Sequence, residues 1–162
     1  VDKDSLRFMM LNRSNDVELD FDFDKVKEKT KDNPVFYVQY AYARINSLLR
    51  TLNIDLDSKI LLNEENFELN KNEEKIIRKI FEWPKTIESA SKNFELHKIP
   101  FYLYELSTLF HSYWSKGNID KKYKFIENNE IKRIEILAII NLVVVVIQNG
   151  MRILGVSLPK KM

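Results

Sequence analysis

Two tyrosines, an arginine and a serine lie at helical spacing in the segment 34–52. At positions i, i+3, i+7 and i+10, one stripe of a helix would carry Tyr37, Tyr40, Arg44 and Ser47. Aromatic rings can stack on exposed nucleic acid bases, and a guanidinium can bind phosphate. The same pattern is typical of tyrosines half-buried against a neighbouring helix, with the arginine in an ion pair. The spacing alone leaves both interpretations open.

Two further groups of charged residues have a functional and an ordinary interpretation. The lysines around Tyr123 in the segment 121–124 suit a phosphate backbone, yet such runs are also common on solvated loops. Paired carboxylates can bind Mg²⁺ or act as acids and bases. The acidic run of this chain consists of Asp16, Glu18, Asp20, Asp22 and Asp24. We interpret it as a solvated edge with helix N-caps.

The composition excludes several kinds of site. There is no Cys, so disulfides, zinc ribbons and thiol catalysis are excluded, and two histidines, His97 and His111, are too few for a three-histidine metal site. We interpret His111, near the end of a predicted helix, as a surface or capping residue. The motifs G-x-x-x-x-G-K-[ST], G-x-G-x-x-G, H-E-x-x-H and G-x-S-x-G do not occur. With 26 Lys+Arg against 24 Asp+Glu, any nucleic acid surface must be a local patch.

The segments that carry these residues are predicted to be helices. Only 3 Gly and 4 Pro in 162 residues argue against a loop-rich all-β architecture and favour an all-α helical bundle. The tyrosine helix begins after Asp32-Asn33, because Pro34 favours the first helical position. The alternation over 17–23 predicts a short strand or an extended linker. Helices are predicted over residues 4–13, 34–52, 64–68, 72–81, 84–93, 100–114 and 129–154.

The last predicted helix contains the longest apolar stretch, which runs from Ile136 to Ile147 and is interrupted by Asn141. A membrane span needs roughly 20 apolar residues, so this stretch is too short and predicts a buried helix. Because it is apolar nearly all round, we expect it to be the central helix of the bundle. Gly155 is expected to cap its C-terminus, and Pro159 prevents the helix from resuming.

Four segments, in the expected order, resemble the arginyl-tRNA synthetase family. Residues 32–45, D-N-P-V-F-Y-V-Q-Y-A-Y-A-R-I, are similar to the D-N-P-x-x-Y-x-Q-Y-A-H-A-R-like start of its anticodon-binding domain. Residues 7–8 and 19–22 are similar to the stretch that joins its catalytic domain to this helix. Residues 102–110 resemble its Y-L-Y-D-L-A-x-x-F helix, and residues 150–162 resemble its G-L-x-x-L-G-I-x-x-x-x-x-M ending. The resemblance covers nearly the whole chain.

The resemblance implies a helical bundle of the class I synthetase anticodon-binding type in residues 32–162, after a connector, residues 1–31, from a missing catalytic domain. The implied enzyme is a cytoplasmic, monomeric ligase that attaches arginine to tRNA using ATP. Its His-Ile-Gly-His-like and Lys-Met-Ser-Lys-like signatures do not occur here. We therefore expect a fragment that is not catalytic alone and needs no cofactor of its own, in agreement with the polar start at Val1 and the lack of a signal peptide. The implied partners are the tRNA anticodon stem-loop and the catalytic domain, with no membrane.

Together with the stripe, the resemblance predicts one tRNA-binding set. Its members are Tyr37, Gln39, Tyr40, Arg44, Ser47, Trp114, Arg133 and Met162. Trp114 ends the predicted helix 100–114, where a large ring can lie at the rim of the bundle. Met162 is included by resemblance only. The chain departs from the family at Tyr42, where the family usually has His, and at Ile136, where a second Arg of an R-x-x-R-L helix start is expected.

Two other interpretations stay open at this point. The first is the related helical domain of another class I synthetase, such as the cysteinyl enzyme, although the segment 32–40 argues against it. The second is a helical protein-interaction bundle without RNA affinity, which the near-neutral net charge of +2 favours. A salt titration of tRNA binding separates RNA binding from this last alternative, because phosphate contacts give a steep salt dependence.

Overall fold

The computed structural model describes residues 2–14, 16–17, 24, 27–28, 30–55 and 68–162. In this part of the chain the helices are α1 (Lys3–Leu11), α3 (Pro34–Thr51), α4 (Lys71–Phe81), α5 (Trp83–Lys92), α6 (Lys98–Ile119) and α7 (Ile134–Leu154). A 3-10 helix, η2 (Lys121–Tyr123), and two short strands, β1 (Ile126–Glu127) and β2 (Glu130–Ile131), connect α6 to α7. The predicted all-α bundle is confirmed.

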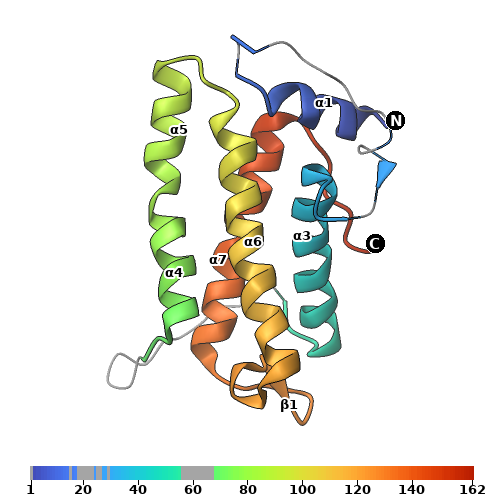
Figure 1. The fold of residues 1–162 in the computed structure, drawn as a ribbon. Helices are drawn as coiled ribbons and strands as arrows, with labels where there is room; N and C mark the ends of the chain where they lie inside the picture. Colours follow the sequence, from blue (N-terminus) through green and yellow to red (C-terminus); the bar gives the residue numbers. More distant parts are fainter. Residues whose placement is uncertain (1, 15, 18–23, 25–26, 29, 56–67) are drawn as a thin grey trace.

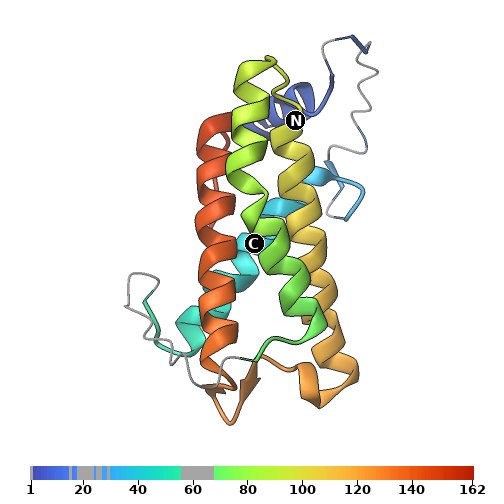
Figure 2. The ribbon, with the colours of Figure 1, turned by 90° about the vertical axis from the view of Figure 1, so that its left-hand side faces the viewer.

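The long helices stand side by side, and α1 lies across one end of them (Figure 1). Helices α4 and α5 follow each other along one side of the bundle, as the turned view also shows (Figure 2). Helix α6 contacts α3, α4, α5 and α7, and α7 in turn contacts α1, α3, α4 and α6, so both helices lie inside the bundle. The expected burial of the last helix is confirmed, and Val144 on α7 is only 1% exposed. Its Leu142 and Val145 are about half exposed, so this apolar helix is not covered on every side.

Local sequence signals explain where the helices begin and end. Pro34 occupies the first turn of α3, and the Asn33 side chain accepts a hydrogen bond from the backbone N–H of Phe36. Helix α7 ends at Gly155, whose φ of 67° is the left-handed conformation expected for a C-cap glycine. Both signals were predicted from the sequence.

The segment between α6 and α7 differs most from the sequence prediction. Helix α6 continues to Ile119, so Trp114 lies within the helix and not at its end. Helix α7 begins at Ile134 and not near position 129, because residues 126–131 form an antiparallel hairpin. The two turn residues of the hairpin are Asn128 and Asn129. Their φ angles are 52° and 61°, values that Asn tolerates better than most residues.

Three further predictions fall outside the described residues. The expected helix at 64–68, except for its last residue, and the strand or linker at 17–23, except for Val17, cannot be compared with the structure. The same holds for the carboxylates at 18, 20 and 22. Within the part that the structure describes, no group of His, Cys, Asp and Glu could hold a metal ion.

Helix α7 is long and apolar enough to cross a membrane by length and composition alone. In the structure, however, 56% of its most apolar window is buried inside the bundle. Core helices of folded proteins pass the same length and composition test, so we interpret α7 as a core helix of the bundle.

Candidate functional site

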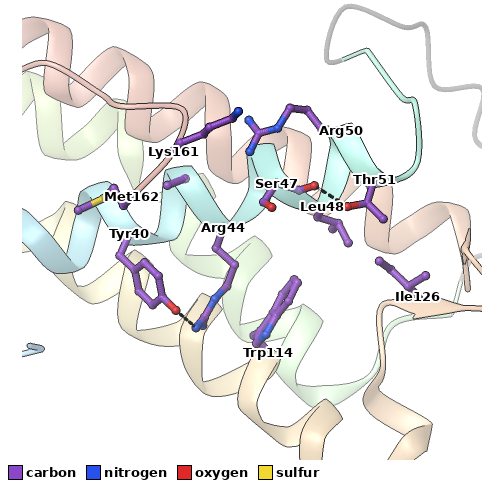
Figure 3. A pocket seen from close by; sticks show the side chains of 11 residues that line it. Tyr40, Arg44, Ser47, Leu48, Arg50, Thr51, Trp114, Ile126, Lys161 and Met162 are labelled. Atoms are coloured by element: carbon purple, nitrogen blue, oxygen red, sulfur yellow. Dashed lines mark hydrogen bonds between the residues drawn. The ribbon is translucent and has the colours of Figure 1, made fainter.

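A cleft of about 610 Å³ opens between α3, α6, the first strand and the C-terminal residues (Figure 3). It brings together five of the eight residues predicted to bind tRNA, namely Tyr40, Arg44, Ser47, Trp114 and Met162. The other residues that line it are Ala43, Leu48, Arg50, Thr51, Ile126 and Lys161. The cleft therefore combines aromatic rings with several cations and a flexible thioether.

The Arg44 guanidinium lies between two aromatic rings of the cleft. Its Cζ atom is 4.3 Å from the ring centroid of Tyr40 and 5.3 Å from that of Trp114. Its Nη2 donates a hydrogen bond of 2.6 Å to the Tyr40 hydroxyl, which Figure 3 marks. A guanidinium over aromatic faces is held by attraction to the ring quadrupole as well as by its hydrogen bonds. Two aromatic rings and the cation between them thus form one contact group that lines the cleft.

His111 of α6 contacts both Arg44 and Tyr40. It is only 5% exposed, so the expectation of a surface or capping residue is wrong. Its Nδ1 is 3.0 Å from Nη1 of Arg44, and its Nε2 is 3.2 Å from the backbone oxygen of Tyr37. Burial lowers the pKa of His111 to about 4, and the positive charge of Arg44 acts in the same direction. The imidazole is therefore neutral at physiological pH.

Tyr37 lies one turn before Tyr40 but does not line the cleft. Its ring packs against His111 and Tyr104, at centroid distances of 4.4 and 5.4 Å. Burial raises the pKa of its hydroxyl above the usual value. The structure therefore divides the stripe, since Tyr37 is a packed tyrosine while Tyr40 and Arg44 line the cleft.

Gln39 holds the C-terminal segment against α3. Its Nε2 donates a hydrogen bond of 3.0 Å to the backbone oxygen of Ser157. Three turns further along α3, Nη1 of Arg50 donates a bond of 2.9 Å to the backbone oxygen of Lys160. These two contacts, which we call the tail clamp, guide the last residues to the cleft, where Met162 lies beside Tyr40 in Figure 3.

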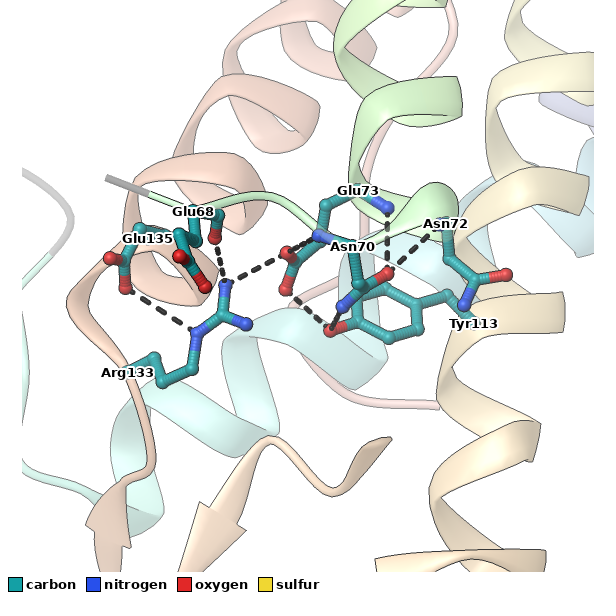
Figure 4. A network of polar contacts seen from close by, with 7 residues as sticks. All are labelled: Glu68, Asn70, Asn72, Glu73, Tyr113, Arg133 and Glu135. Atoms are coloured by element: carbon teal, nitrogen blue, oxygen red, sulfur yellow. Dashed lines mark hydrogen bonds and ion pairs between the residues drawn. The ribbon is translucent and has the colours of Figure 1, made fainter. Parts of the chain in front are cut away.

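Arg133 belongs to a different group of residues, at the start of α7 (Figure 4). Its Nη2 lies 2.8 Å from the Glu73 carboxylate and also donates to the backbone oxygen of Glu68. Glu73 is fully buried and accepts a further bond of 2.6 Å from the Tyr113 hydroxyl. Burial and the bond to Glu73 raise the pKa of Tyr113, so its hydroxyl stays protonated and donates. None of these residues lines the cleft, and Arg133 joins α7 to the start of α4.

Several cleft residues were missed by the sequence analysis. Arg50 lies three positions after Ser47, so extending the predicted stripe by one turn would have found it. Ile126 comes from the hairpin, for which the sequence analysis had no signal. The lysine run around Tyr123 is largely exposed, and Lys124 lines a smaller cavity of about 230 Å³ that shares Trp114 and Ile126 with the cleft.

The chain is similar to known proteins over its whole length. The chain is 52% identical over 164 residues to "Arginine--tRNA ligase" of Pelagibacter ubique (strain HTCC1062) and 40% identical over 168 residues to that of Allorhizobium ampelinum. The alignments cover 100% of this chain but only 28% and 29% of those proteins, so the chain spans less than a third of their length.

The fold also has a counterpart among solved structures. A Campylobacter jejuni protein assigned as an arginyl-tRNA synthetase superposes with a TM-score of 0.82 at 23% identity, over 98% of this chain and 33% of that chain. At this identity the likeness shows the fold alone. Residues 38–162 match the family model described as the DALR anticodon binding domain. This match includes every residue that lines the cleft, and the chain therefore belongs to the DALR anticodon-binding domain family.

Proposed function

We propose that this chain is the tRNA-binding part of an arginine–tRNA ligase and that its cleft receives the anticodon loop. The observation that carries the proposal is the grouping of Tyr40, Trp114 and Arg44 around one open cleft in a DALR domain. Single-stranded RNA loops are recognised by stacking their splayed bases on aromatic side chains and by contacts from cations to phosphates. The cleft offers both kinds of contact at one place.

Seven of the eleven residues that line the cleft take part in this proposal. Tyr40 and Trp114 offer ring surfaces to bases, and Arg44 offers N–H groups to a phosphate or a base edge. Arg50 and Lys161 add positive charge at the cleft, and Met162 can pack against a base. Ser47 lines the cleft with a small hydroxyl side chain.

The remaining three predicted residues have supporting roles in the proposal. Tyr37 packs against His111, and Gln39 holds the tail that ends in Met162. Arg133 anchors α7 through Glu73. We assign none of these three a direct contact with tRNA, because none lines the cleft.

For the whole protein, we propose a cytoplasmic monomeric ligase that attaches arginine to its tRNA using ATP and does not contact membranes. Residues 1–31 form the connector to a catalytic domain, and residues 32–162 form the anticodon-binding domain. We assign the binding of ATP and arginine to the catalytic domain, because these 162 residues contain no glycine-rich phosphate-binding motif. This part alone is therefore not expected to catalyse aminoacylation.

The test is tRNA affinity of a full-length ligase that carries this chain. Stacking is worth about 1–3 kcal/mol per base, so Tyr40→Ala and Trp114→Ala should each weaken binding of an arginine-accepting tRNA transcript by about tenfold. Phe81→Ala is the matched control, because Phe81 is an aromatic residue that is 79% exposed and does not line the cleft. Parental affinity of both cleft variants, with circular dichroism showing a folded protein, would contradict the proposal.

A further inference from the structure

We propose that His111 is a positioning residue, which fixes the Arg44 guanidinium in the orientation that meets RNA. The proposal rests on the proposed function, since it assumes that Arg44 contacts tRNA. His111 does not line the cleft, so it would act through Arg44 and not by touching the nucleic acid itself. Three observations carry the proposal: the hydrogen bonds of the imidazole, its burial, and the position of Arg44 between rings.

The partners of the imidazole determine which nitrogen carries the proton. A guanidinium can only donate hydrogen bonds, so Nδ1 of His111 must accept from Nη1 of Arg44, at 3.0 Å. A backbone oxygen can only accept, so Nε2–H donates to the oxygen of Tyr37, at 3.2 Å. The neutral Nε2–H tautomer satisfies both contacts, whereas a doubly protonated ring would direct an N–H at a cation. A pKa of about 4 keeps the ring in the neutral form.

The imidazole is itself held firmly. Its ring stacks on Tyr40, with centroids 5.4 Å apart and an interplanar angle of 22°, and it also packs on Tyr37 and Phe110. Its Nε2–H bond ties it to the backbone of α3, while its own backbone belongs to α6. The Nδ1 acceptor is therefore a fixed point that links the two helices forming the cleft.

Arg44 receives its orientation from two acceptors in different directions. Nη2 bonds the Tyr40 hydroxyl and Nη1 bonds His111, so the planar guanidinium cannot rotate without losing one of the two bonds. The N–H groups not used in these bonds stay available to the cleft. Without the acceptor at His111, the flexible arginine side chain keeps one bond and gains alternative rotamers. Binding of tRNA would then have to order the Arg44 side chain, and the loss of conformational entropy would reduce affinity.

Two matched substitutions separate the two hydrogen bonds of His111. Asparagine places its side-chain oxygen near the position of Nδ1, so His111→Asn keeps an acceptor for Arg44. Glutamine reaches further and places its amide nitrogen near Nε2, so His111→Gln keeps the donor to Tyr37 and loses the acceptor. Both variants lose the ring, and thermal unfolding of each measures that shared structural cost.

The experiment measures binding of an arginine-accepting tRNA transcript to the full-length ligase. Because hydrogen bonds to charged groups are among the stronger ones, we expect His111→Gln to weaken binding by about fivefold or more, and His111→Asn to stay within about twofold of the parent. In the background of Arg44→Ala, His111→Gln should have no further effect, since two residues that act through one contact are not additive.

The outcomes distinguish this proposal from the proposed function. If Trp114→Ala and Arg44→Ala weaken binding while folded His111→Gln binds like the parent, the cleft binds tRNA but His111 does not position Arg44. An equal loss in His111→Asn and His111→Gln, or a further loss in the Arg44→Ala background, also overturns the proposal and indicates a general structural role. If no cleft substitution changes binding, both proposals fail.

Discussion

Replacing Arg133 with methionine tests whether this residue stabilises the fold or binds tRNA. The family resemblance predicted a tRNA contact, whereas the structure places Arg133 on the Glu73 carboxylate at 2.8 Å. Methionine has a similar length and no charge, so Arg133→Met removes the ion pair and leaves Glu73 in the interior. The Tyr113 hydroxyl and the backbone N–H of Asn70 still donate to Glu73.

The expected loss of stability follows from the burial of the two partners. Removing one partner of a buried ion pair costs about 3–5 kcal/mol. The Glu73 side chain is 0% exposed, but that of Arg133 is 35% exposed, so water screens part of the interaction. With this screening and the two remaining donors, we expect Arg133→Met to lower the free energy of unfolding by about 2 kcal/mol.

Urea unfolding of the parent and of Arg133→Met measures this loss as a shift of the midpoint at unchanged slope. In a Glu73→Gln background, Arg133→Met should lower the free energy of unfolding by less, with a difference of about 1 kcal/mol or more. The reason is that glutamine has no carboxylate charge to leave unpaired. Arg78→Met on the exposed side of α4 is the control. If Arg133→Met is as stable as the parent and the full-length ligase that carries it binds tRNA more weakly, the structural role of Arg133 is contradicted. A direct contact of Arg133 with tRNA is then supported.

Three other predictions concern the core, the buried histidine and the cleft. Val144→Asp should lower the free energy of unfolding by about 3 kcal/mol or more, because Val144 is only 1% exposed. The control Val145→Asp, at a position that is 49% exposed, should change stability little. Equal thermal melting of the two variants would contradict the packing of α7. The pKa of His111 is 6.5 in the unfolded chain and about 4 in the folded chain, so only the unfolded chain takes up the proton between these values. The free energy of unfolding should therefore fall as the pH drops from 6.5 toward 4, by up to about 3 kcal/mol. Urea unfolding at several pH values should show a weaker pH dependence for His111→Gln, and identical curves would contradict this assignment. Arg44→Ala should weaken tRNA binding and reduce the slope of log affinity against log salt by about one charge, and an unchanged slope with lowered affinity would mean that Arg44 contacts no phosphate.

The sequence predicted helices well where local signals were strong. Asn33 and Pro34 marked the start of α3, and Gly155 marked the end of α7. The predicted helix ended at Trp114, five residues before the end of α6 at Ile119. In the structure Gly117 is helical, and a Cβ there would lie 3.0 Å from the backbone oxygen of Tyr123, so the glycine allows η2 to pack closely against the helix. A close approach between two segments of the chain leaves no recognisable pattern in the local sequence.

The candidate site was predictable only as far as it depends on the sequence of a single helix. Helical spacing on α3 places Tyr40, Arg44 and Ser47 on one face, which the cleft confirms as a shared surface. Spacing on one helix cannot show which of its residues a second helix covers. The burial of His111 depends on α3, and the pairing of Arg133 depends on α4, so both roles become visible only when the helices are packed.

The tail clamp has a consequence for the order in which the molecule folds. Its two hydrogen bonds join residues 118 and 110 positions apart, and a bond from the backbone N–H of Ser157 to Asp4 spans 153 positions. Contacts between such distant residues form only after the helices that carry them have packed. Exposed hydrogen bonds near a chain end also open most readily in the folded state. We therefore expect the wall of the cleft that contains Met162 to assemble last and to exchange its amide hydrogens first, while Arg44 and Trp114 remain in place on the packed helices.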